Sequence, residues 1–372
     1  MNQQVSSAAH GDAAESPQAA EREAQRDAER QERARRRQAA VAAFPYVAVH
    51  LLTSGIHPAT SRVIAVDAVT FNDAGEIGED FHAVLNPGEN PGPFHLHGLQ
   101  PGEIAAGKTF SQVLKPLGRL LDDRTLVVHD ASQTWGFLVA EARRAMNAAA
   151  RANRSKRRGR SRRRRHRVGH VPRPAAVVDT LATARRQGVQ LADTRPAGLA
   201  AALHLEAPSP VASVERACRE EAEVTREITE LIVDIHLLQR ERGEVASRSP
   251  QQLRADQFGL QRTTVRVDAV EAPRPLDNPG PYVPGHPLRK GMEVVVAPEI
   301  EMDPDEIIAA CLREELAYSE KLTRQTSVVV CNQTRELTGK AMHAQRKGIP
   351  LLSDTEFMAA VRQVSGGGRR ES

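Results

Sequence analysis

The sequence predicts an α/β protein of two domains, and two patterns of apolar residues carry this prediction. Over residues 43–242, three apolar strands are followed by a mixture of strands and helices, which is typical of an α/β domain. Residues 289–364 follow the order βαβαβα, which predicts a small parallel sheet. Residues 243–288 lie between the two patterns and contain six prolines after position 272, so we expect a semi-extended linker there.

The elements of the first domain follow from the spacing of its apolar residues. Strands are predicted over Tyr46–Val49, Arg62–Phe71 and Glu79–Leu85, with Asp73-Ala74-Gly75 as a hairpin turn between the last two. Apolar residues recur at helical spacing over Phe110–Leu121. The remaining pattern predicts a strand over 125–128, a helix over 135–149, globular segments over 177–186 and 198–205, and a long helix over about 213–240.

The second domain is predicted in the same way. Its helices begin with recognisable signals, because Pro304 stands in the first turn of one and Ser353 with Glu356 forms a capping box at another. The pattern predicts strands over 292–296, 327–331 and 349–352, and helices over 303–317, 338–347 and 353–364. Within the linker, Thr263–Val270 could form one more strand.

The ends of the chain lack the residues that build a core. Residues 1–42 are charged and have no apolar stripe, so we expect a disordered tail or a transient helix, and 365–372 form a second tail. No apolar run approaches 18 residues and the N-terminus is polar, so neither a membrane span nor a secretory signal is expected. The three cysteines have no CxxC spacing, which favours a cytoplasmic protein without disulfides.

A basic run interrupts the first domain as an insert over 150–172. The net charge of the chain is +4, and residues 151–167 hold eleven Lys and Arg and no acid, so the rest of the chain sums to −7. Such a run can neutralise phosphates without reading sequence, and it contains no aromatic residue for base stacking. The alternative is a solvated arginine loop. The predicted nucleic-acid-binding residues are Arg154, Lys156, Arg157, Arg158, Arg160, Arg162, Arg163, Arg164, Arg165 and Arg167.

Several motifs of the first domain resemble the DEDDh 3′–5′ exonuclease family, in the branch of the DNA polymerase III epsilon subunit. This resemblance implies a ribonuclease H-like fold, in which a mixed sheet is flanked by helices. It covers about 200 residues. The segments that carry it are Val49-His50-Leu51-Leu52-Thr53-Ser54-Gly55, His97-Gly98-Leu99, His129-Asp130-Ala131-Ser132-Gln133-Thr134-Trp135-Gly136-Phe137-Leu138 and Asp179-Thr180-Leu181.

The family's chemistry needs four carboxylates and a histidine, and this sequence departs from all five. Two Mg²⁺ or Mn²⁺ ions require hard oxygen ligands, and the histidine takes a proton from water. Leucine and alanine cannot hold such ions, so we expect no cofactor and no intact catalytic residue. Asp130 is the best candidate for a rearranged site, whereas Asp179 is expected to cap a helix. The family positions are occupied by His50, Leu52, Thr134, Ala212 and Ala217.

The second domain resembles BRCT domains, an addition to epsilon-like exonucleases that is familiar in actinobacteria. The resemblance rests on the strands ending at Val296 and Cys331, on Gly339-Lys340, and on Gly348-Ile349-Pro350. It implies binding of phosphorylated partners, with Lys340 at the phosphate. Ala297-Pro298 replaces the family's hydroxyl and a backbone donor, so weak phosphate binding through a lone Lys340, or plain protein docking, is expected.

Three functions remain open from the sequence. The first is a catalytically inactive exonuclease-family protein of DNA replication or repair, which binds nucleic acid or partner proteins. The second is a metal-dependent 3′–5′ exonuclease with a rearranged site. The third is a protein-binding scaffold in which the basic run plays no part.

Overall fold

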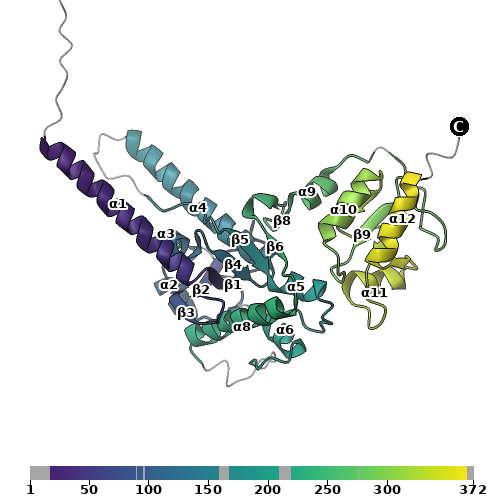
Figure 1. Ribbon diagram of the computed structural model, residues 1–372, viewed down its shortest axis with the longest axis horizontal. Coiled ribbons are helices and arrows are strands. Elements are labelled where there is room, and N and C mark those ends of the chain that lie inside the picture. The colour runs from purple at the N-terminus through teal and green to yellow at the C-terminus, as the bar shows by residue number, and fades with distance from the viewer. Residues whose placement is uncertain are drawn as a thin grey trace, which may run out of the picture.

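The structure is a computed structural model that describes residues 17–88, 90–94, 97–158, 167–208, 219–274 and 276–366. It contains two large sheets, each with its own apolar core, and a two-stranded sheet between them in the chain. In Figure 1 the first sheet and its helices are purple to green, and the second sheet and its helices are green to yellow. The predicted α/β class is therefore confirmed.

The first sheet has six strands in the order β3-β2-β1-β4-β5-β6. Strand β2 runs antiparallel to β1 and β3, β4 and β5 run parallel to β1, and β6 runs antiparallel to β5. This mixed sheet, flanked by helices, is the ribonuclease H-like fold that the motifs predict. The strands are β1 (Tyr46–Thr53), β2 (Val63–Phe71), β3 (Ile77–Val84), β4 (Thr125–Val128), β5 (Ala176–Asp179) and β6 (Ser247–Arg248).

Alternation along β1 explains why helices cover both faces of this sheet. Val47 and Val49 belong to the core under α3 and α4, whereas Ala48 belongs to the core under α6 and α8. The predicted helix Phe110–Leu121 and strand Thr125–Val128 are confirmed to the residue. The helices are α2 (Pro101–Ala106), α3 (Phe110–Leu121), α4 (Ala131–Arg158), α5 (Thr180–Arg186), α6 (Pro196–Ala202) and α8 (Glu221–Arg242).

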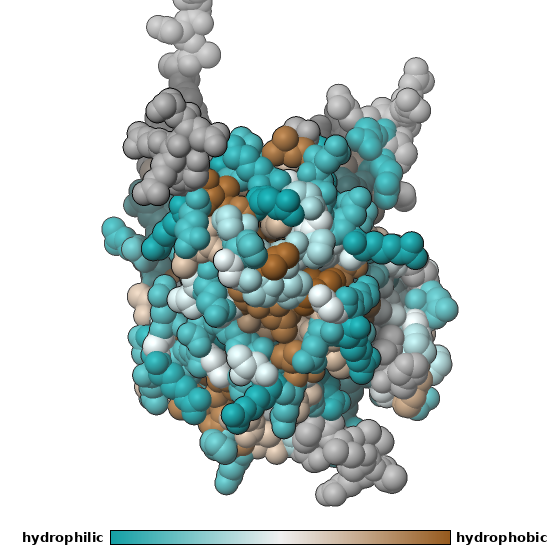
Figure 2. All heavy atoms as spheres, turned by 90° about the vertical axis from the view of Figure 1, so that its right-hand side faces the viewer, coloured by the Kyte–Doolittle hydropathy of each residue, from teal (hydrophilic) through white to brown (hydrophobic). Residues whose placement is uncertain are grey.

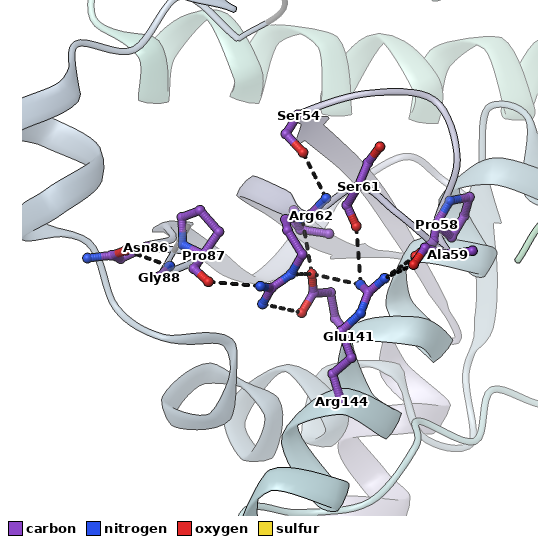
Figure 3. A network of polar contacts seen from close by, with 11 residues as sticks. Ser54, Pro58, Ala59, Ser61, Arg62, Asn86, Pro87, Gly88, Glu141 and Arg144 are labelled. Carbon is purple, nitrogen blue, oxygen red and sulfur yellow. Dashed lines mark hydrogen bonds and ion pairs between the residues drawn. The ribbon is translucent and has the colours of Figure 1, made fainter. Parts of the chain in front are cut away.

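A buried carboxylate joins the turn after β1 to helix α4. The Glu141 side chain is 2% exposed and accepts hydrogen bonds from Arg62, with 2.6 Å between Nε and Oε1 and 3.1 Å between Nη2 and Oε2. Arg144 donates to the same carboxylate at 3.2 Å and also to the carbonyls of Pro58 and Ala59 (Figure 3). The two arginines therefore fix the loop that follows the first motif against α4.

The segment expected to be a semi-extended linker carries regular structure and belongs to both cores. Its strand β6 pairs with β5, and Leu253 packs on the core under α3 and α4. Tyr282 and Leu288 pack instead on the C-terminal core. The strand suggested over Thr263–Val270 is wrong, because those residues end β8 and form a helix whose Ala269 is buried. The elements are β7 (Leu253–Ala255), β8 (Gln261–Thr263), the 3-10 turn Pro250–Gln252 and α9 (Thr264–Glu271).

The C-terminal domain is a four-stranded parallel sheet in the order β10-β9-β11-β12, with helices on both faces. The predicted βαβαβα pattern lacked β10. The helix expected over 303–317 stops at Arg313, because Glu315 takes a left-handed φ of 56°. The elements are β9 (Glu293–Val296), α10 (Pro304–Arg313), β10 (Ala317–Ser319), β11 (Thr326–Val330), α11 (Gly339–Arg346), β12 (Leu351–Leu352) and α12 (Asp354–Gly366).

The N-terminal segment, residues 1–42, was predicted to be either a disordered tail or a transient helix. Its described part is helix α1 (Pro17–Ala43), which is exposed over residues 24–39. Good helix formers dominate the segment, and Arg37 anchors the last turns through a 2.7 Å ion pair with Asp123. Across the described ranges, no helix is long and apolar enough to span a membrane.

Glu141→Gln should lower the free energy of unfolding by about 3 kcal/mol, because two arginines would lose their shared counter-charge in a partly buried site. Urea unfolding followed by the fluorescence of Trp135, the single tryptophan, measures this directly, since that residue is buried on the same helix. The control Glu230→Gln changes an exposed residue of α8 and should shift stability by less than about 0.5 kcal/mol. Equal effects of the two variants would contradict the stabilising role given to the Glu141 carboxylate.

Candidate functional site

The two altered positions of the first motif lie on one face of β1. His50 and Leu52 alternate with Val49 and Leu51, which contact the core under α3 and α4, so they point to the opposite face. Leu52 packs against an apolar cluster that includes Ile64, Ala65, Leu99 and Ile104. An aliphatic contact therefore stands where the family resemblance implies a carboxylate ligand.

His50 is paired with a buried aspartate on the neighbouring strand. Its register partner is Asp67 of β2. Asp67 is fully buried and accepts from Arg226 Nε at 2.9 Å and from Arg226 Nη2 at 3.0 Å. His82 Nδ1 lies 3.2 Å from the same carboxylate, and His82 Nε2 lies 3.1 Å from Glu221. Arg226 also pairs with Asp80 at 3.0 Å.

These contacts determine the protonation states of Asp67 and His82. Burial opposes ionisation of Asp67, but hydrogen bonds from His82 and Arg226 outweigh it and lower the pKa of that carboxyl. Hydrogen bonds to Asp67 and Glu221 raise the pKa of His82 to about 9, so its imidazole is cationic at neutral pH. The carboxylates beside His50 are thus neutralised by protein cations. One sequence feature could have predicted these contacts, namely the charged residue Asp67 within the mostly apolar strand predicted over Arg62–Phe71.

The second motif lies where β4 ends and α4 begins. Thr134 Oγ1 donates to the carbonyl of His129 at 3.1 Å, so this hydroxyl serves the local backbone. His129 is held by Thr180 Oγ1 at 2.9 Å and by the carbonyl of Thr194 at 2.6 Å. Burial lowers the pKa of His129, which keeps its ring neutral.

Asp179 caps a helix, as the sequence predicts. Its carboxylate accepts from the backbone N–H groups of Leu181 at 2.9 Å and Ala182 at 3.1 Å, and also from Ala131 N at 2.9 Å. It therefore serves the first turns of both α5 and α4. Burial, with a further contribution from the charge of Asp130, raises the pKa of Asp179. Asp130 itself has a φ of 55° and accepts from Ser132 Oγ at 2.6 Å.

A cleft of about 660 Å³ brings the second motif next to the C-terminal domain. Asp130 and Asp179 line it from the first domain, and Lys340 lines it from α11. His50, Leu52 and Thr134 are not among its lining residues. Basic side chains from several elements also face the cleft, namely Arg185, Arg186, Arg248, Arg262 and Arg266.

Lys340 is not the lone charge that the sequence suggested. Its Nζ donates to the carbonyl of Val296 at 3.0 Å, and the side chain is half-buried. Burial, with a further contribution from the nearby charge of Arg266, lowers the pKa of Lys340 to about 8. Arg266 comes from α9, and it is itself bound to Glu320. The connecting segment therefore supplies part of the surroundings of this lysine.

The remaining predicted residues are spread over the first domain. Arg154 and Arg167 are exposed. Lys156, Arg157 and Arg158 belong to the last turns of α4, which is longer than the predicted helix. Ala212, Ala217 and the arginines at 160 and 162–165 lie outside the described residues. Among the residues that the structure describes, no group of three or more His, Cys, Asp or Glu side chains is placed to hold a metal ion.

Comparisons with known proteins give structural matches only. No protein-family model matches the sequence, and no curated protein matches it. An E. coli exonuclease I complex with ssDNA, in a zinc-bound form, is 15% identical with a TM-score of 0.36, covering 53% of this chain and 40% of that chain. Exonuclease I from Methylocaldum szegediense is 13% identical with a TM-score of 0.36 and the same coverage. The match spans less than half of each exonuclease, and the fold assignment rests on the sheet topology.

Replacing His82 should reveal its charge as a pH-dependent loss of stability. A folded pKa of about 9 exceeds the usual value of 6.5, so protonated His82 stabilises the fold fully below about pH 6.5 and loses this effect as the pH rises through 9. The difference in unfolding free energy between wild type and His82→Gln should shrink over that window in urea titrations. The exposed control His343→Gln should show no such trend. If the difference in unfolding free energy between wild type and His82→Gln did not change with pH, the raised pKa of His82 would be contradicted.

Proposed function

We propose that this chain is a nucleic-acid-binding protein of DNA replication or repair, which uses an exonuclease-like fold without hydrolysing its ligand. One observation carries the proposal: the described positions that resemble metal ligands hold His50, Leu52 and Thr134. The contacts that Leu52 and Thr134 make are not those of metal ligands. Leu52 packs in an apolar cluster and Thr134 bonds its own backbone. Two-metal hydrolysis needs converging carboxylates, so these residues favour binding over cleavage.

The alternative is a rearranged exonuclease that uses Asp130 and Asp179. Three backbone N–H groups occupy the carboxylate of Asp179, and burial raises the pKa of this group. A carboxylate whose oxygens already accept three backbone hydrogen bonds has few lone pairs left for Mg²⁺ or Mn²⁺. Of this pair, only the carboxylate of Asp130 would then be left for a metal ion, which supports the inactive protein over the rearranged enzyme.

The C-terminal domain contributes docking to a partner protein in this proposal. Figure 2 looks at the molecule from the side of this domain and shows apolar side chains gathered in the middle of a polar face. Among the described residues of this half of the chain, the exposed large apolar side chains are Val270, Leu276, Val283 and Leu312. Apolar surface rimmed by polar residues is common at protein interfaces. Lys340 bonds a backbone carbonyl, so phosphate recognition is the lesser part of this role.

Purified protein should release no nucleotides from the 3′ end of single-stranded or duplex DNA with either Mg²⁺ or Mn²⁺. Each 1.4 kcal/mol of lost transition-state stabilisation costs about tenfold in rate, and several ligands are absent together. An active exonuclease assayed in parallel verifies the conditions. Metal-dependent release that disappears in Asp130→Ala would establish the rearranged enzyme and contradict the proposal.

Removing charge from the basic run should weaken DNA binding and flatten its salt dependence. The variant carries Gln at the positions of Arg160, Arg162, Arg163, Arg164 and Arg165. Each lost phosphate contact on duplex DNA reduces the slope of log K against log salt by about 0.9, so a reduction of up to about 4.5 is expected. Fluorescence anisotropy at several salt concentrations measures the slope, and thermal melting should show unchanged stability. An unaltered slope would show that the run makes no contact.

A further inference from the structure

A second cavity, of about 600 Å³, lies apart from the cleft that holds Asp130 and Lys340. Three helices and one loop form it: the end of α1, the outer face of α3, the second half of α4, and residues 167–170. We call it the α3–α4 groove. Its floor is apolar, with Leu114, Met146 and Ala149. In Figure 1, α1 and α4 project from the same end of the first domain.

The charges on the α3–α4 groove are almost all positive. Its lining includes five basic side chains and a single acid, Asp122; the basic residues are Arg37, Lys115, Arg119, Arg167 and His170. Asp122 is already engaged, because it accepts from the backbone N–H of Arg173 at 2.7 Å and lies 2.9 Å from His170 Nε2. The groove therefore has no acid left to neutralise the other cations.

Three of these cations are available to a ligand. Lys115, Arg119 and Arg167 are exposed, and none of them forms an ion pair with another described residue. Elsewhere in the first domain, exposed and half-buried arginines form ion pairs with acidic side chains. Arg226 pairs with Asp67, and Arg240 pairs with Asp73. Uncompensated cations in a concave surface concentrate positive potential and attract an extended polyanion.

The fold fixes Arg167, the last residue of the basic run, at the edge of this groove. Gly169 has a φ of 111°, and a Cβ there would lie 3.3 Å from Leu114 and 3.6 Å from the backbone of Lys115. Val168 is buried beside it, so the chain that leaves the run is packed directly on α3. Arg167 is therefore held at the rim, close to Lys115 of the same groove.

We infer that the α3–α4 groove is a binding site for the phosphodiester backbone of a nucleic acid, and this inference rests on the proposed function. Lys115 and Arg119 lie one helical turn apart, so both side chains can reach along one strand. Among the described residues that line the groove there is no Phe, Tyr or Trp for base stacking, so contacts go to phosphates and carry no sequence preference. The groove lies on the α3 and α4 side of the sheet, whereas His50 and Leu52 point to the other face.

The test replaces the two cations of α3 and compares them with a matched pair elsewhere. Lys115→Gln with Arg119→Gln removes two charges from the groove. Arg346→Gln with Lys347→Gln removes the same charge from exposed positions at the end of α11. Both full-length variants are titrated against a labelled DNA duplex by fluorescence anisotropy, and thermal melting verifies that each is folded.

The groove variant should bind the duplex about tenfold or more weakly, and its salt slope should fall by about 1.8, which corresponds to two phosphate contacts. The α11 control should keep the wild-type slope. If the variant with Gln across the basic run loses affinity but the groove variant binds like the control, the inference is overturned while the proposed function stands. If the wild-type chain does not bind DNA at all, both fail together.

Discussion

The ion pair between Arg62 and the buried carboxylate of Glu141 is the contact on which the geometry of the first domain depends. Arg62 also donates to the carbonyl of Pro87 at 2.8 Å, and Arg144 reaches back to Pro58 and Ala59. Two loops, the one between β1 and β2 and the one after β3, are thereby tied to one point on α4. None of these groups belongs to the positions that resemble metal ligands, so the contacts that fix these loops are independent of those positions.

On the face of β1 that carries His50, protein side chains balance the charge of a buried carboxylate. In a two-metal site, clustered carboxylates repel one another unless cations compensate them. Here Leu52 adds no charge, and the buried carboxylate of Asp67 is compensated by Arg226 and His82. Protein cations from α8 and β3 provide the compensation, so the sheet and α8 are joined where the resemblance implies a reaction centre.

The distribution of cations separates structural from binding roles. Arg62, Arg226 and Arg266 are half-buried and each holds an acid from a distant part of the chain. Lys115 and Arg119 are exposed and lack such partners among the described residues. Because the chain outside residues 151–167 carries −7, cations left unpaired stand out against an acidic background. This contrast supports a phosphate-binding surface on the α3 and α4 side of the domain.

The sequence by itself determined the periodic elements and which residues stand at the positions that resemble metal ligands. Phe110–Leu121 and Thr125–Val128 were predictable to the residue because helical spacing and a short apolar run are local signals. Only the tertiary structure determined which charged side chains lie close to one another. Asp67 and Arg226 are 159 positions apart, and Lys340 lies near Arg266 only because α9 packs beside the cleft. Periodicity depends on neighbours in the chain, whereas a buried charge depends on elements that pack against it from any distance along the sequence.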